Sequence, residues 1–65
     1  MKRFTRNICL DMCYIFEDLA AIELCQKLCR KDLLLAARII AEEGSKKYGK
    51  EWIESFSKKW TLVTR

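Results

Sequence analysis

The fold is decided by residues 18–43, which read DLAAIELCQKLCRKDLLLAARIIAEE. Most of these residues are good helix formers, and the apolar ones return to one helical face at 100° per residue. Asp32 falls in the centre of that apolar face, where an unpaired carboxylate would be costly to bury. We therefore predict one helix that begins at an Asp18 N-cap and, after a break at Asp32, a second helix over residues 33–43. Gly44 is predicted to end this segment as a C-terminal cap.

Helices are also predicted on both sides of this stretch. Thr5 can cap a first helix that runs to about Phe16, and a shift of the polar stripe places a break near residues 17–18. This first helix is apolar on most of its surface, so we expect it to be buried on most sides. Ser45 is predicted to cap a last helix over residues 47–61.

The composition agrees with a wholly helical chain. There is no proline, and the only glycines are Gly44 and Gly49, which are too few for strands joined by tight turns. The 65 residues allow one domain, residues 1–65, and we predict an all-α bundle of three to four helices. A domain of this size buries a limited share of its surface, yet 51% of its residues are apolar. We therefore expect self-association, most simply a homodimer, to complete the core.

The net charge of the chain and the length of its apolar runs indicate which partners and which location to expect. Thirteen Lys and Arg against nine Asp and Glu give a formal charge of +4, which suits an anionic partner such as nucleic acid or simply keeps the chain in solution. No run approaches the ~20 apolar residues of a membrane span. Asp11 interrupts the apolar run that follows the basic start, which disfavours a signal peptide. We therefore expect a cytoplasmic protein without a transmembrane segment.

The four cysteines form two pairs, Cys9-x-x-x-Cys13 and Cys25-x-x-x-Cys29. On a helix, each pair lies one turn apart on one face. A hairpin that turns near Leu19, the midpoint of both pairings, would bring Cys9 to Cys29 and Cys13 to Cys25. Two disulfides between neighbouring helices require that geometry.

This spacing resembles the twin C-x-x-x-C pattern of the small Tim chaperones of the mitochondrial intermembrane space, over residues 9–29. Those proteins carry long helical arms before the first cysteine, whereas eight residues precede Cys9 here, so we do not assign the chain to that family. Disulfides, a zinc or iron–sulfur site and free thiols all stay open. We favour free cysteines, because free cysteine is a small buried hydrophobe and metal knuckles usually use C-x-x-C on turns.

The residues of the chain give little support for an enzymatic function. The chain has no histidine and no glycine-rich phosphate loop. The most common general base and the Cys–His nucleophile pair are therefore absent, and we expect the carboxylates to be solvated. We predict a protein that is not an enzyme and has no cofactor.

The last predicted helix carries an aromatic residue at every fourth position, opposite a row of lysines. Such a stripe forms core or anchors a partner, since interface energy concentrates in aromatic residues. We predict a non-enzymatic interaction module, an adaptor, inhibitor or regulator, that binds another protein or itself through Tyr48, Trp52, Phe56 and Trp60. One alternative is a nucleic-acid-binding regulator that uses the basic residues Lys2, Arg3, Arg6, Lys46, Lys47 and Lys50. A second alternative is a cysteine-based metal or disulfide module.

Overall fold

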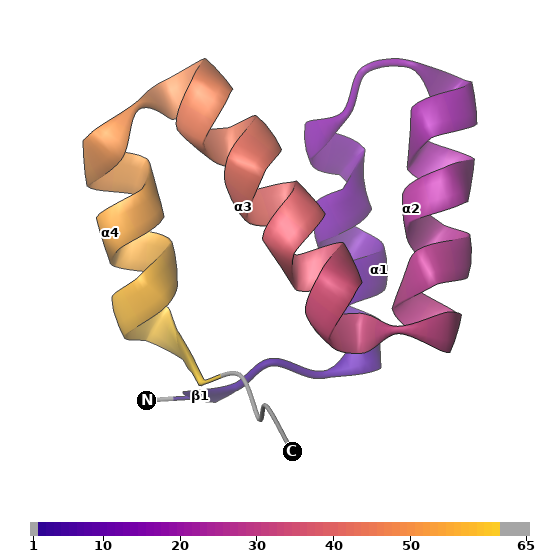
Figure 1. The fold of residues 1–65 in the computed structure, drawn as a ribbon, viewed down its shortest axis with the longest axis horizontal. Coiled ribbons are helices and arrows are strands. Elements are labelled where there is room, and N and C mark those ends of the chain that lie inside the picture. The colour runs from indigo at the N-terminus through magenta and orange to yellow at the C-terminus, as the bar shows by residue number, and fades with distance from the viewer. Residues whose placement is uncertain (1, 62–65) are drawn as a thin grey trace.

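The chain folds into a small all-α bundle, as predicted (Figure 1). The computed structural model describes residues 2–61. Its helices are α1 (Arg6–Met12), α2 (Leu19–Lys31), α3 (Leu33–Tyr48) and α4 (Lys50–Lys59), and a 3-10 turn, η1 (Cys13–Ile15), follows α1. None of the helices in this part of the chain is long and apolar enough to cross a membrane.

Three helix starts lie where the sequence predicts them. The side chain of Thr5 accepts a hydrogen bond from the Ile8 amide at 3.3 Å, and Asp18 accepts one from the Ala20 amide at 3.4 Å. Asp32 both ends α2 and caps α3, since its Oδ1 accepts from the Leu35 amide at 3.2 Å. The Asp32 carboxylate is thus exposed and caps the start of α3, so it is not buried in the apolar face.

The predicted break at Gly44 is wrong, and so is the Ser45 cap. Both residues lie inside α3, which continues to Tyr48 and ends at Gly49, where φ is +87°. Gly44 is needed for a different reason: a Cβ atom there would overlap the indole ring of Trp52 on α4. Gly44 therefore permits close packing of two helices. Gly49 ends the helix with a positive φ and a ψ of −170°, a backbone conformation that is essentially restricted to glycine.

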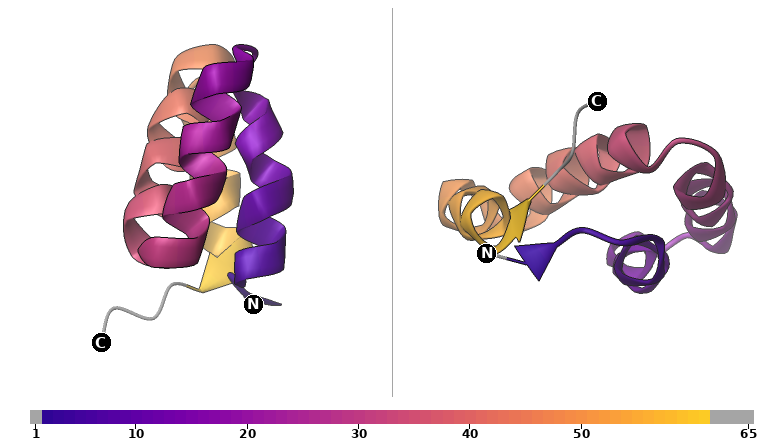
Figure 2. Two further views of the ribbon diagram at one scale, coloured as in Figure 1. Left: turned by 90° about the vertical axis from the view of Figure 1, so that its right-hand side faces the viewer. Right: turned by 90° about the horizontal axis from the view of Figure 1, so that it is seen from below.

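The helices form a slab of 29 × 27 × 15 Å (Figure 2). Figure 1 shows α1 and α2 side by side and running in opposite directions, while α3 crosses to α4 at the other side of the slab. Two short strands, β1 (Lys2–Arg3) and β2 (Trp60–Thr61), pair in parallel and bring the two ends of the described chain together.

The core has two chemically different parts joined by α3. Between α1, η1 and α2 lie the four cysteines, all at most 4% exposed. Where α3 meets α4 the core is aromatic, and Phe4, which precedes α1, packs edge-on against Phe56 and Trp60 at 5.8 and 6.0 Å between ring centroids. Between the two parts α3 contributes three fully buried residues, Ala36, Ala37 and Ile40.

Candidate functional site

An apolar groove lies between α2 and α3. Its walls are almost entirely carbon, and its lining residues are Phe16, Ala21, Leu24, Cys25, Leu28 and Ile39. Leu24, at the edge of the groove, is 66% exposed and so adds apolar surface that a partner could cover. The groove encloses about 220 Å³, below the ~300–1,000 Å³ typical of small-molecule pockets. Its size and chemistry therefore suit apolar side chains of a polypeptide better than a metabolite.

Basic residues border one side of this groove. A shallower depression that shares Leu24 and Leu28 with it is also lined by Lys27, Arg30 and Lys31. No acidic residue occurs on α2 after Glu23, and the carboxylate of Asp32, just beyond the helix, is engaged as a cap. The apolar groove thus has a positively charged margin on the C-terminal half of α2.

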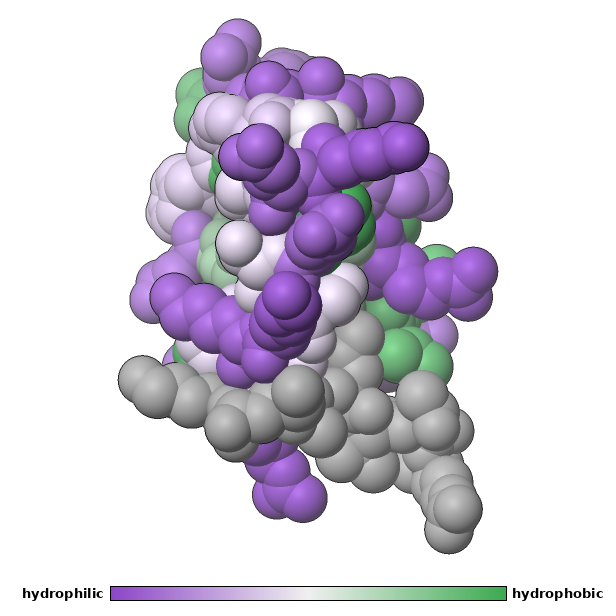
Figure 3. Space-filling model, turned by 90° about the vertical axis from the view of Figure 1, so that its left-hand side faces the viewer, coloured by the Kyte–Doolittle hydropathy of each residue, from purple (hydrophilic) through white to green (hydrophobic). Residues whose placement is uncertain are grey.

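The four aromatic residues predicted to bind a partner lie on one stripe, but they differ in exposure. Phe56 is 6% exposed and stacks on Trp52 at 5.2 Å, and both Trp52 and Trp60 are half-buried. Only Tyr48, at 60%, is exposed. Figure 3, viewed from the side of α4, shows mainly hydrophilic side chains across this face. Most of the aromatic stripe therefore contributes to the core of this chain.

The basic residues of the nucleic-acid alternative do not form one surface. Lys2 and Arg3 form β1 and Arg6 begins α1, at one end of the molecule, whereas the junction of α3 and α4 that carries Lys46, Lys47 and Lys50 lies at the opposite end (Figure 1). The amine of Lys47 is also engaged within the chain, since it donates to the Ile15 carbonyl and pairs with Glu17 at 3.4 Å.

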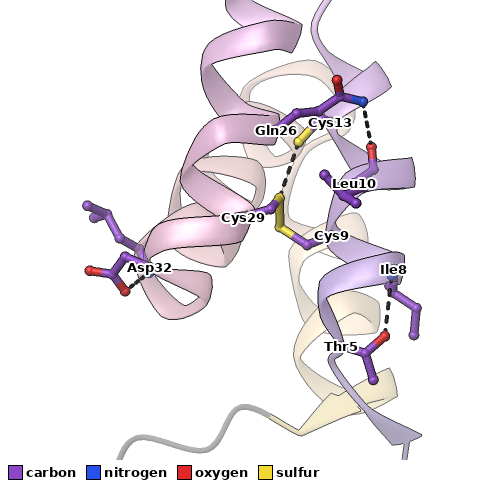
Figure 4. The surroundings of a disulfide bond; sticks show 9 residues. Thr5, Ile8, Cys9, Leu10, Cys13, Gln26, Cys29 and Asp32 are labelled. Atoms are coloured by element: carbon purple, nitrogen blue, oxygen red, sulfur yellow. Dashed lines mark hydrogen bonds between the residues drawn. A yellow bond between two sulfur atoms is a disulfide. The ribbon is translucent and has the colours of Figure 1, made fainter.

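The cysteines are not four free thiols, contrary to the favoured prediction. Cys9 of α1 and Cys29 of α2 form a disulfide with a Cα–Cα distance of 5.9 Å, as the hairpin geometry requires (Figure 4). The antiparallel course of α1 and α2 brings these two turns together. Nearby, the Gln26 side chain donates to the Leu10 carbonyl at 3.3 Å and holds the same two helices in register.

Cys13 and Cys25 are free thiols in the same cluster. The Sγ atom of Cys13 lies 3.5 Å from that of Cys29, and the two side chains point toward each other in Figure 4. Burial raises the pKa of the Cys13 thiol from 9.0 to about 12, and the neighbouring Cys25 thiol adds to the increase. The thiol is therefore held protonated beside a disulfide with which its thiolate would otherwise exchange.

Two features of the site were missed at the level of sequence. The groove residue Leu24 lies at the edge of the polar stripe of α2, between Lys27 and Leu28 on the helix surface, and an apolar residue beside lysines was the signal that could have revealed it. Phe4 precedes the Thr5 cap, a position where an apolar residue often packs back on the structure, and it is 3% exposed.

Comparison with protein-family models, curated proteins and solved structures finds no match for this chain. The function therefore has to be inferred from the groove, its charged margin and the cysteine cluster.

Proposed function

We propose that this protein is a non-enzymatic interaction module that binds an amphipathic helical segment of another protein in the groove between α2 and α3. The observation that carries the proposal is the apolar groove with the exposed Leu24 at its edge. Helix-in-groove binding buries apolar anchors that recur every three or four residues of the partner helix. A groove of this size accepts one or two such anchors.

The charge beside the groove indicates the kind of partner. Lys27, Arg30 and Lys31 border the shared edge at Leu24 and Leu28, so a partner with acidic residues flanking its apolar face would be attracted and oriented. A second copy of this chain would bring the same basic residues against each other. The margin of the groove therefore favours an acidic partner over a second copy.

The other parts of the proposal come from the sequence. The homodimer predicted from the apolar surplus stays a prediction, and the exposed leucines Leu19 and Leu35, at 76% and 42%, are surfaces that it could use. Tyr48 remains the exposed member of the aromatic stripe for a second contact. We propose a cytoplasmic location, where the thiols of the cysteine cluster would be kept reduced.

The test uses two synthetic helical peptides with the same leucine face. One carries glutamates on both flanks and the other carries lysines. We expect the acidic peptide to bind and to shift the methyl resonances of Leu24, Leu28 and Ile39 in NMR spectra, while the basic peptide does not. Sedimentation of the protein alone measures self-association in the same buffer.

The matched variants are Leu24→Ser in the groove and Leu19→Ser outside it. Both remove an exposed leucine from α2, but Leu19 does not line the groove. We expect Leu24→Ser to weaken binding at least on the order of tenfold, as loss of an interface anchor does, and Leu19→Ser to leave it unchanged. Equal effects of the two variants, or no binding of the acidic peptide, would overturn the proposal. Loss of a dimer on Leu24→Ser would assign the groove to a second copy instead.

A further inference from the structure

The cysteine cluster contains more sulfur than its disulfide uses. The Sγ atoms of Cys9, Cys13 and Cys29 all lie within 4.8 Å of one another, and all three side chains are buried. The fourth cysteine, Cys25, is 4% exposed and interacts with Cys13. Three sulfur atoms from α1, η1 and α2 therefore meet in one enclosed place, and the buried Cys25 thiol is a neighbour of Cys13 outside this group of three.

The spacing of these sulfurs matches that of a thiolate metal centre. Tetrahedral zinc with Zn–S bonds of ~2.3 Å places its sulfur ligands ~3.8 Å apart. Cys13 and Cys29 are already 3.5 Å apart, and Cys9 lies within 4.8 Å of Cys13. Cleavage of the Cys9–Cys29 bond would have to let these two sulfurs separate by about 1.6 Å to reach the same spacing. No oxygen or nitrogen ligand belongs to the group within residues 2–61, and an all-sulfur set selects zinc over magnesium or calcium.

We propose that the reduced form of this cluster is a zinc site, in which Cys9, Cys13 and Cys29 bind one Zn²⁺ per chain and the neighbouring Cys25 moves in as the fourth ligand. The disulfide form cannot bind the metal in this way, because two of the four sulfurs are bonded to each other. Oxidation and zinc binding are therefore mutually exclusive states of the same cluster. Cys25 also lines the groove, so the zinc site and the groove share one residue, but the inference does not depend on what the groove binds.

The conversion requires a thiol reductant. Two molecules of a low-molecular-weight thiol cleave the Cys9–Cys29 bond, are themselves oxidised to a disulfide, and leave two cysteine thiols. Zinc then replaces the protons of the four thiols, which are released to the solvent. In the cytoplasm glutathione and thioredoxin keep thiols reduced, so the zinc form is the one expected there.

The site would also serve the fold. Zinc would join α1 and η1 to α2 at the same two turns that the disulfide joins, so each state cross-links the helical hairpin. A structural zinc site contributes its binding energy to folding. The hairpin would then stay closed in reducing and in oxidising surroundings, by different chemistry.

The test compares the whole chain in both redox states. The reduced, metal-free protein is titrated with Zn²⁺ against a chromophoric chelator, and native mass spectrometry measures the stoichiometry. Co²⁺ serves as a spectroscopic probe, because four thiolates in a tetrahedron produce strong sulfur-to-metal charge-transfer absorption. We expect one metal per reduced chain and none bound to the disulfide form.

Cys13→Ser is the decisive variant, because it leaves the Cys9–Cys29 disulfide intact and its fold can be checked in the oxidised state. After reduction we expect its zinc affinity to fall by more than the roughly 10–100-fold that loss of a second-shell partner causes. Cys25→Ser tests the fourth ligand in the same way. The proposal is wrong if the reduced wild type does not bind one zinc, or if Cys13→Ser binds zinc with the same affinity as the wild type. The cluster would then be a disulfide with two free thiols that bind no metal.

Discussion

The two halves of this molecule are held together in different ways. Between α1 and α2 a covalent bond joins Cys9 to Cys29, and between α3 and α4 an aromatic stack built on Trp52 and Phe56 fits against Gly44. The first half depends on the redox state of its surroundings, and the second depends on shape alone. A chain of 65 residues has too little core to rely on either half by itself. We therefore expect substitutions in the two halves to lower the free energy of unfolding by different amounts, and different second changes to restore it.

The largest loss is expected in the aromatic half. Phe56→Ala removes the buried ring that packs against Phe4 and Trp52, and we expect it to lower the free energy of unfolding by about 3–5 kcal/mol. Urea denaturation followed by circular dichroism measures this change. Tyr48→Ala, at an exposed position of the same stripe, is the control and should cost far less. Similar losses for the two variants would mean that the stripe does not form the core.

The disulfide comes next. The bond closes a loop over a sequence separation of 20, which corresponds to about 3 kcal/mol of stability. We expect the double variant Cys9→Ser, Cys29→Ser to lose about this amount in metal-free buffer, and hydrogen exchange to accelerate most in α1 and α2. Cys13→Ala, which keeps the bond, is the matched control. If exchange accelerates equally in α4, the two halves are not separable and the comparison fails.

A smaller loss is expected from crowding the contact between α3 and α4. Gly44→Ala places a methyl group where the Trp52 ring lies, and overpacking of this kind costs about 1–3 kcal/mol. Combining it with Trp52→Leu should recover part of the loss, which thermal denaturation of both variants measures. Gly49→Ala is a useful contrast. The added methyl group meets no neighbour, but the backbone at φ +87° and ψ −170° should cost about 1–3 kcal/mol that no change at Trp52 restores. Full additivity of the Gly44 and Trp52 changes would argue against the close packing.

The smallest effect near neutral pH concerns Cys13. Its pKa of about 12, against 9.0 for an ordinary cysteine, lowers the thiolate fraction at pH 8 about 1,000-fold. We expect alkylation of Cys13 in the folded, oxidised protein to be slower than in urea by at least this factor, and to accelerate with pH up to about 12. The same shift stabilises the folded state fully below pH 9, and this contribution is lost as pH rises from 9 toward 12. Mass spectrometry of quenched samples measures the rate, and a rate equal to that in urea contradicts the assigned pKa.

Local signals explain what could be predicted from the sequence. Thr5, Asp18 and Asp32 cap helices through bonds to amides two or three residues away, so their own sequence neighbourhood was enough to identify them. The closeness of Cys9 to Cys29 followed from a hairpin that turns near Leu19, the midpoint of the two residues, although the favoured prediction was free thiols. The fold class followed from the same local information.

Tertiary contacts explain what could not be predicted. Gly44 looks like a helix end in sequence, and only the Trp52 ring on another helix shows that it is a packing glycine. An aromatic stripe such as the one on α4 occurs both in interfaces and in cores, so the sequence pattern does not distinguish the two. Phe56 is buried because Phe4, from the other end of the chain, packs against it. The groove required knowing that α2 and α3 diverge from Asp32 and leave Leu24 uncovered.

The parallel pairing of β1 with β2 has a consequence for how the molecule is made. The partners Lys2 and Trp60 lie almost the full length of the described chain apart, and Phe4 has no aromatic ring to pack on until α4 exists. On a ribosome α1 and α2 can pair as soon as α2 emerges, because Cys9 and Cys29 are then both synthesised, and α3 covers the pair later. The segment before α1 must wait, with its phenylalanine uncovered, until Trp60 has left the exit tunnel. Synthesis therefore divides folding into an early pairing of α1 with α2 and a late closure of the segment before α1 against α4. In the interval between these two steps a chaperone or a protease would find the chain open.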